Sequence, residues 1–239
     1  MNRPGGAAGP RQAVCALCRR AAAGTLPPVV PPTADASVDR PSQPFRDGLG
    51  FFGRFLRNPL QVGAVLPSSR YLSRALVGRL DLQPGELVVE FGPGTGPATA
   101  IVRESLPAGA RYLGIELDKG FHGLLTQRFP SLEFVNGSAA DLRQILADRG
   151  LPRPVRILSG LPFASLPPKI QDDIVDAVVW ALHGAAGDFR TFQYVHAYGL
   201  RAARRFRAMM QERFHGFERI GPTMRNVPPA FVLRYWHAK

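Results

Sequence analysis

The sequence predicts an α/β fold built on a doubly wound, mostly parallel sheet. Short apolar runs alternate with helical patterns between residues 87 and 213, which is typical of strands joined by crossover helices. The first apolar run enters a turn with glycines at positions 92, 94 and 96, and the chain closes on two apolar runs with no helix between them. Its 239 residues, 45% of them hydrophobic, can bury one sizeable core plus an extension.

Seven strands are expected in this sheet, and each crossover carries a helix. The predicted strands cover residues 87–90, 111–115, 132–135, 155–158, 189–197, 214–220 and 230–236. The predicted helices between them cover residues 98–106, 118–129, 141–148, 167–182 and 200–213. We therefore expect a Rossmann-like, doubly wound seven-stranded sheet that ends in an antiparallel closing strand pair and is preceded by N-terminal helices.

The chain ahead of the sheet divides into a tail and two helical segments. Residues 1–44 are rich in Pro, Ala and Gly and predict a disordered tail, residues 45–82 hold the two helices, and residues 83–239 form the main domain. The first helical segment places aromatic side chains on one face and arginines on the other, which suits either a membrane interface or packing on the core. The candidate membrane-binding residues are Phe51, Phe52, Arg54, Phe55, Leu56 and Arg57.

The second helical segment, residues 71–80, follows Ser68 and Ser69, either of which can cap its N-terminus. A helix in this place can cover a ligand at the sheet edge, so we expect a lid.

Charge and cysteine content limit the possible partners. The net charge is +12, and residues 189–239 carry ten Lys or Arg against two acids, so we expect a surface that attracts nucleic acid, anionic lipid or both. No apolar run approaches the roughly 20 residues that span a bilayer. Cys15 and Cys18 have no second pair to complete a metal site. We expect a cytoplasmic protein without a metal.

The turn after the first strand predicts the cofactor. Its order is Glu90-x-Gly92-x-Gly94-x-Gly96, so that an acid precedes the glycines. A carboxylate in that place repels a phosphate and suits an ammonium group, and S-adenosylmethionine combines an ammonium group with a nucleoside. The pattern resembles motif I of the class I S-adenosylmethionine-dependent methyltransferases; the alternative is a glycine-rich turn of another Rossmann-like protein.

The ends of three further strands belong to the predicted cofactor site. Glu116 ends the second strand, 20 residues after the last glycine, where an acid accepts hydrogen bonds from ribose hydroxyls; alternatively it caps the next helix. Ser138 and Ala139 follow the third strand and are candidate adenine contacts. Ser159 follows the fourth strand in Ser-Gly-Leu-Pro-Phe, which takes the place of the loop that holds the target nitrogen in aminomethyltransferases.

Five segments together resemble the soluble bacterial phospholipid N-methyltransferases. They are Asn58-Pro59, residues 63–72 (GAVLPSSRYL), residues 90–96 (EFGPGTG), residues 159–162 (SGLP) and residues 225–230 (RNVPPA). This resemblance implies successive methylation of phosphatidylethanolamine towards phosphatidylcholine, with the first amphipathic helix as anchor to an anionic, phosphatidylethanolamine-containing membrane. It implies peripheral association with the inner membrane. The sequence departs from the family at Ser138, where the family has an acid, and in a stretched segment at residues 193–199.

The target ammonium must lose a proton before it can attack the methyl group. The candidate catalytic residues at the sheet edge are Ser159, Tyr194, His196 and Tyr198, with His183 as a further candidate base. Desolvation near a membrane would itself lower the pKa of the ammonium, so a strong base is not required. Candidate contacts to the lipid head group are Ser68, Ser69, Arg201, Arg204 and Arg205.

Two other functions stay open at this point. An RNA adenine N6-methyltransferase has related motifs and suits the positive charge, although Ser159 stands where an Asn or Asp would hold a base amide. A non-catalytic lipid-binding protein with a degenerate cofactor pocket is the second alternative, because Ser138 replaces the acid near the adenine. Binding of nucleic acid is less expected than binding of lipid and is not excluded.

Overall fold

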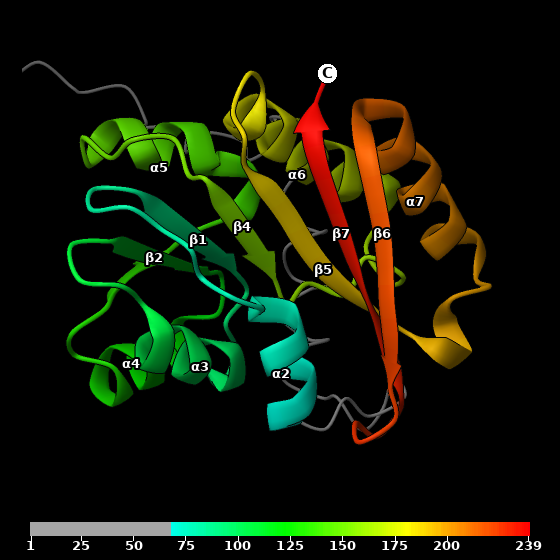
Figure 1. The fold of residues 1–239 in the computed structure, drawn as a ribbon, viewed down its shortest axis with the longest axis horizontal. Coiled ribbons are helices and arrows are strands. Elements are labelled where there is room, and N and C mark those ends of the chain that lie inside the picture. The colour runs from blue at the N-terminus through cyan, green and yellow to red at the C-terminus, as the bar shows by residue number, and fades with distance from the viewer. Residues whose placement is uncertain (1–67) are drawn as a thin grey trace, which may run out of the picture. The chain divides into compact units, whose positions relative to one another are not determined.

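The computed structural model describes residues 68–239. The predictions for residues 1–67, including the tail and the membrane-binding helix with Phe51 to Arg57, lie outside the described residues. Within the described part, seven strands form one sheet in the order β3-β2-β1-β4-β5-β7-β6 (Figure 1). The predicted fold class is confirmed.

The strands and helices alternate as the sequence predicts. The strands are β1 Leu87–Phe91, β2 Arg111–Glu116, β3 Glu133–Asn136, β4 Arg156–Ser159, β5 Asp188–Tyr194, β6 Phe214–Thr223 and β7 Ala230–Ala238. The helices are α2 Arg70–Val77, α3 Pro97–Ser105, α4 Lys119–Arg128, α5 Leu142–Asp148, α6 Pro168–Leu182 and α7 Arg201–Arg213, with 3-10 turns η1 Ala139–Asp141 and η2 Val195–Ala197.

The central strands are parallel, and β7 alone runs against its neighbours. β1 pairs in parallel with β2 and β4, and β4 pairs in parallel with β5. β7 enters antiparallel between β5 and β6. The carboxyl ends of β1, β2, β4 and β5 therefore meet at one edge, where an open α/β sheet binds its ligands.

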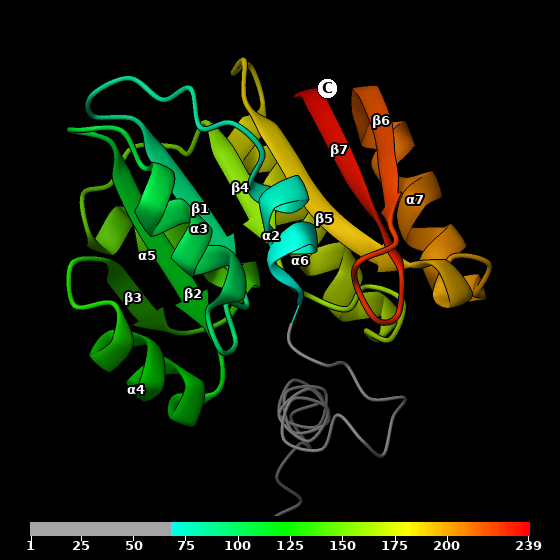
Figure 2. The ribbon, with the colours of Figure 1, turned by 60° about the horizontal axis from the view of Figure 1, so that its bottom comes forward.

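The helices cover both faces of the sheet. α2, α3 and α4 lie on one face, and α5, α6 and α7 lie on the other (Figures 1 and 2). The first face is filled by side chains such as Leu72, Val102 and Tyr112, and the second by Ile174, Phe206 and Tyr235. Because β1 is buried along its whole length, its end is a fixed platform for the glycine turn.

Capping residues set the limits of α2 and α4. Ser69 accepts a hydrogen bond from the N–H of Leu72 at 3.2 Å, so α2 begins one residue earlier than predicted, at Arg70. It ends at Gly78, whose φ of 59° favours glycine. Asp118 caps α4 by accepting from the N–H groups of Gly120 and Phe121.

The predicted fifth strand, residues 189–197, is too long. β5 ends at Tyr194, and the chain continues as η2. The N–H of Val195 still donates to the carbonyl of Pro229 at 2.9 Å, but Pro229 has no N–H to donate in return, so the ladder stops there. The chain leaves the sheet at this point, beside the expected catalytic residues. None of the described helices is long and apolar enough to cross a membrane.

A buried cluster of charges holds the opposite edge of the sheet. Asp188 is 3% exposed and pairs with Arg156, Arg190 and Arg234 at 2.7, 2.9 and 2.6 Å. Burial raises the pKa of Asp188, but the arginines more than offset this and hold its pKa below the usual value. The cluster joins β4, β5 and β7 far from the glycine turn.

Candidate active site

The glycine turn leaves its backbone open to a ligand. Gly92, Gly94 and Gly96 have φ values of 62°, 60° and 82°, in the left-handed region that favours glycine. A Cβ on Gly96 would lie 2.6 Å from the Phe129 ring, whereas a Cβ on Gly94 would meet nothing within 4 Å. The tip of the turn is therefore the part that faces open space.

Glu90 is a buried acid in the last residues of β1, one before its end at Phe91. It is 2% exposed, and its Oε2 accepts hydrogen bonds from Thr99 Oγ1 at 2.8 Å and from the Tyr112 hydroxyl at 2.7 Å. Burial raises the pKa of Glu90 to about 7, although the two hydrogen bonds act to lower it. Both donors reach the same oxygen, so Oε1 is the oxygen that remains for a ligand.

Glu116 connects the ends of two strands. Its Oε2 accepts from the N–H of Gly94 and its Oε1 from the N–H of Asp118, both at 2.9 Å. Burial raises the pKa of this carboxyl above its usual value. The side chain is fully buried and does not line the cavity at the glycine turn, so the further lone pair of each oxygen is closed to a ribose while the turn keeps this position. Capping of α4, the alternative role, belongs to Asp118.

A cavity of about 130 Å³ joins the glycine turn to α2. The residues that line it come from α2, β1, the glycine turn, the start of α3, the loop after β4, and β5. They are Ser68, Leu72, Ser73, Leu76, Glu90, Gly92, Pro93, Gly94, Thr95, Pro97, Ala98, Gly160 and Phe192. α2 therefore forms one wall of this cavity, and Glu90 and the glycines form another. That α2 acts as a lid stays a prediction.

The loop after β4 packs closely against the glycine turn. A Cβ on Gly160 would lie 2.6 Å from the carbonyl oxygen of Gly92, so glycine is required for this approach. Ser159 is fully buried, and its hydroxyl accepts from the N–H of Leu161 at 3.2 Å. Phe163 points into the core and stacks on Phe206 with ring centroids 4.0 Å apart.

The serine in the turn after β3 forms its hydrogen bond within that turn. Ser138 caps η1 by accepting from the N–H of Ala140 at 3.2 Å, and Ala139 is buried. Neither side chain is a carboxylate, so backbone groups are what this turn offers to an adenine.

The candidate catalytic residues near β5 lie on opposite faces of the sheet and are not brought together. Tyr194 packs on the α2 face against Phe192 and stacks on exposed His196, with ring centroids 5.4 and 5.6 Å apart. Its hydroxyl is buried without a partner among the described residues, and burial raises its pKa to about 12. Tyr198 lies on the α7 face, where Arg207 covers its ring at 3.7 Å.

His183 lies at the opposite edge of the sheet, before β5 begins. Its Nδ1 contacts the carbonyl oxygen of Lys239 at 2.9 Å. The expectation that it lies beside the reacting groups is wrong, because α6 returns the chain to the amino end of β5 before His183.

Some of the candidate head-group residues are available to a ligand, and others are already bonded within the protein. Ser68 lines the cavity, while Ser69 is occupied as the cap of α2. Arg201 and Arg204 are exposed. Arg205 instead pairs with Asp172 at 2.7 Å and donates to Gln171 at 2.9 Å, which fixes α7 to α6.

Three residues of the site escaped the sequence reasoning. Thr99 and Tyr112 donate hydrogen bonds to the Glu90 carboxyl. A tyrosine in an otherwise aliphatic part of the second strand is the one feature of the sequence that could have indicated this role. Asn226 is 2% exposed and accepts from the N–H of Ser69 at 2.8 Å. It lies in residues 225–230, one of the segments that carry the family resemblance, but nothing in the sequence places this segment beside α2.

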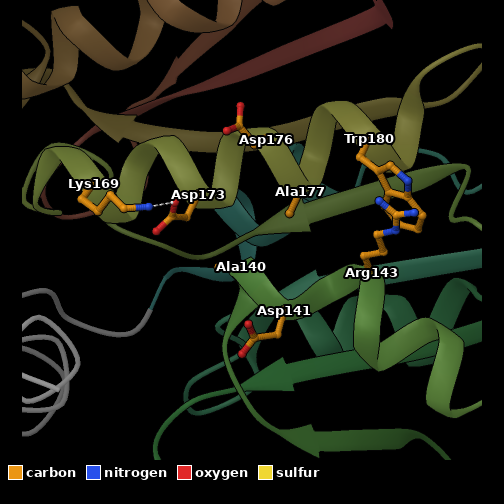
Figure 3. A pocket seen from close by; sticks show the side chains of 8 residues that line it. All are labelled: Ala140, Asp141, Arg143, Lys169, Asp173, Asp176, Ala177 and Trp180. Atoms are coloured by element: carbon orange, nitrogen blue, oxygen red, sulfur yellow. Dashed lines mark hydrogen bonds and ion pairs between the residues drawn. The ribbon is translucent and has the colours of Figure 1, made fainter. Parts of the chain in front are cut away.

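A second hollow, of about 430 Å³, lies between α6 and the η1–α5 segment (Figure 3). Its charges are largely paired: Lys169 with Asp173, Asp176 with Arg213 at 2.7 Å, and Arg143 over the Trp180 ring at 5.2 Å. No residue of the glycine turn lines it. The smaller cavity under α2 is therefore the candidate cofactor site.

Comparison with known proteins agrees with this geometry. No protein-family model matches the chain. The ornithine lipid N-methyltransferase of Singulisphaera acidiphila is 32% identical over 190 residues, which cover 77% of this chain and 93% of that protein. The ribosomal RNA small subunit methyltransferase A of Prosthecochloris aestuarii is 27% identical over 109 residues, which cover 45% of this chain and only 40% of that protein.

Solved structures show the same fold at low identity. The O-methyltransferase TomG of Streptomyces achromogenes, in complex with S-adenosylmethionine, superposes with a TM-score of 0.54 at 17% identity over 80% of this chain and 90% of that one. Fibrillarin of Aeropyrum pernix, with natively bound S-adenosylmethionine, gives 0.51 at 11% identity over 70% and 75%. The protein described here is thus a class I S-adenosylmethionine-dependent methyltransferase and belongs to the same family as the ornithine lipid N-methyltransferase of Singulisphaera acidiphila.

Proposed function

We propose that the protein transfers methyl groups from S-adenosylmethionine to the primary amine of a lipid head group at a membrane surface. The observation that carries this proposal is the extent of the likeness: it runs through 93% of a lipid N-methyltransferase, but through only 40% of a ribosomal RNA methyltransferase. The family resemblance favours phosphatidylethanolamine as the acceptor, and the relative's name favours an ornithine lipid. Both head groups carry an amine and an acidic group.

The site residues suit the cofactor at both ends. Glu90 offers a buried carboxylate oxygen in the cavity to the ammonium group. Glu116 is fully buried against the N–H of Gly94 and can offer its remaining lone pairs to the ribose once the glycine turn moves. Bound there, S-adenosylmethionine supplies a methyl group on a positively charged sulfur. The acceptor nitrogen must approach in line with the sulfur–methyl bond that breaks, at about 3–3.5 Å from the methyl carbon. The loop around Gly160 lines the cavity and can set the direction of this approach.

The acceptor amine must be neutral when it attacks. The Tyr194 hydroxyl, with a pKa of about 12, keeps its proton near neutral pH, so it is not the base. Its oxygen is also buried and does not line the cavity, so Tyr194 packs beside the site and does not contact the amine. Desolvation of the ammonium at the membrane lowers its pKa, and water can then take the released proton.

A planar nucleobase suits the site less well. Phe163, the aromatic residue of the loop after β4, is 1% exposed and stacked in the core, so it is not available to stack on a base. The Ser159 hydroxyl is fully buried and already accepts a hydrogen bond within the loop. Exposed Arg201 and Arg204 can instead attract the phosphate or carboxylate of a lipid.

The experiment is methyl transfer from radiolabelled S-adenosylmethionine by the purified full chain. Separate reactions would contain vesicles with phosphatidylethanolamine, vesicles with an ornithine lipid, and ribosomal RNA. We expect label in the lipid of one vesicle type, in mono- and dimethylated forms, and none in RNA. Label in RNA alone would replace this proposal with the RNA methyltransferase alternative, and binding of the cofactor without any transfer would favour the non-catalytic one.

A further inference from the structure

Exposed apolar side chains gather at one edge of the molecule. Six large apolar residues are exposed among residues 68–239: Tyr71, Leu124, Val195, Leu200, Met224 and Val227. Met224 and Val227 are the most exposed, at 70% and 68%. Leu124 lies on α4 beside β3, at the opposite end of the sheet from β7 and β6.

Hydrogen bonds join the segments that carry four of these residues. The loop between β6 and β7 lies beside the start of α2 (Figure 2). Asn226 accepts from the N–H of Ser69, and Arg225 donates to the Tyr71 hydroxyl at 3.2 Å. On its other side the loop carbonyl of Pro229 accepts from the N–H of Val195. We call Tyr71, Val195, Met224 and Val227 the rim patch.

The rim patch adjoins the cofactor cavity. Ser68 and Leu72 line that cavity from either side of Tyr71 along the chain. Asn226 also donates to the carbonyl of Pro228, so its buried amide holds the β6–β7 loop against the helix that covers the cavity. The apolar side chains are therefore carried by an anchored loop beside the candidate active site.

The surroundings of the rim patch are positively charged. The segments 68–77, 195–207 and 224–229 contain seven arginines and no acid. Two of these arginines are paired, Arg70 with Glu104 at 3.3 Å and Arg205 with Asp172. Arg74, Arg201, Arg204 and Arg225 are exposed. Exposed apolar side chains on segments that also carry exposed arginines match a bilayer with anionic head groups, where each nearby arginine contributes about 1 kcal/mol.

We propose that the rim patch docks on an anionic lipid bilayer and brings the cavity mouth against the head groups. The proposal rests on the proposed lipid substrate and adds the surface that meets the membrane. A second copy of the chain fits less well, because its own arginines would face these. Residues 45–67 fit less well for the same reason, since they contain three arginines and one acid.

The test compares Met224→Ser/Val227→Ser with the matched variant Leu124→Ser. Full-length proteins are sedimented with vesicles of equal parts phosphatidylethanolamine and phosphatidylglycerol. We expect the double variant to partition roughly tenfold more weakly, because the membrane no longer buries two apolar side chains, and Leu124→Ser to partition like wild type. Equal partitioning of all three proteins would overturn the proposal.

Methyl transfer separates docking from chemistry. The second acceptor is a short-chain phosphatidylethanolamine kept below its critical micelle concentration. The double variant should keep the wild-type kcat/KM for this monomeric lipid and lose vesicle methylation in proportion to binding. An equal loss on both acceptors would place the loop in catalysis and overturn docking. If wild type binds vesicles through these residues yet methylates neither lipid, the proposed function fails and the docking surface stands.

A labelling experiment tests whether the chain covers its own rim patch. Cys15 and Cys18 are replaced by serine, and a single cysteine at position 224 or 124 carries an environment-sensitive dye. We expect a blue shift at position 224 with vesicles, free access to an aqueous quencher without them, and no change at position 124. Protection of position 224 without vesicles would assign the patch to another part of the chain or to a second copy, and would overturn the proposal.

Discussion

The protonation of Glu90 should control how tightly the protein binds its cofactor. Its buried carboxyl has a pKa of about 7 in the empty site, whereas the ammonium group of S-adenosylmethionine requires the ionised form. Below pH 7 binding must first remove a proton from Glu90, at about 1.4 kcal/mol per pH unit. From pH 7.5 to pH 5.5 the affinity should therefore fall by about 25-fold, if the bound carboxylate stays ionised throughout.

The same pKa predicts how the stability of the empty protein depends on pH. The folded-state pKa is raised from 4.5 to about 7, so between these values the folded state holds a proton that the unfolded state has lost. The free energy of unfolding should fall as pH rises through this window, by about 3 kcal/mol in total from this group. Cofactor binding, which favours the carboxylate, should offset that loss.

Isothermal titration calorimetry of cofactor binding between pH 5.5 and 7.5 measures the effect. Glu90→Gln should bind weakly at every pH, because the neutral amide cannot ionise, and should lose the wild-type slope. Asp148→Asn, an exposed acid on α5, is the matched control and should keep that slope. An unchanged slope in Glu90→Gln would refute the reasoning and assign the pH dependence to another group.

Three further substitutions test the supports of the site. Tyr112→Phe removes a hydrogen bond that lowers the pKa of Glu90, so the midpoint of pH-dependent cofactor binding should move above 7 in the same calorimetric titration. Asn226→Ala leaves the N–H of Ser69 without its partner; unfolding in urea should show a loss of about 1–3 kcal/mol, with a raised KM for the cofactor. Asp188→Asn leaves three arginines without their carboxylate, so the thermal midpoint should fall by about 10 °C while kcat is kept.

The sequence is sufficient for the succession of strands and helices along the chain because each apolar run and each helix has a strong local signal. Glu90 and Glu116 could likewise be placed at adjacent strand ends, since parallel strands bring their carboxyl ends to one edge. The exact end of β5 could not be predicted. It depends on Pro229, which lies opposite Val195 but 34 residues away in the chain and has no N–H to return the bond from Val195.

The substrate side of the site was harder to predict than the cofactor side. Tyr194 and Tyr198 are four residues apart and both looked available to a substrate, but η2 turns the chain between them and places them on opposite faces of the sheet. Arg205 looked free for a lipid phosphate, yet Asp172 on α6 engages it. Pairing across helices far apart in the chain decides such roles, and a single sequence carries no signal for it.

The central claim is that this methyltransferase acts on the amine of a membrane lipid. The most direct measurement is mass spectrometry of lipids extracted from bacterial cells that lack methylated lipids and express either the full chain or its Glu90→Gln variant. We expect phosphatidylethanolamine or ornithine lipid carrying one or more added methyl groups with the wild-type chain, and at least tenfold less with the variant. Unmodified lipids despite stable expression, with S-adenosylmethionine bound by the purified protein, would contradict it.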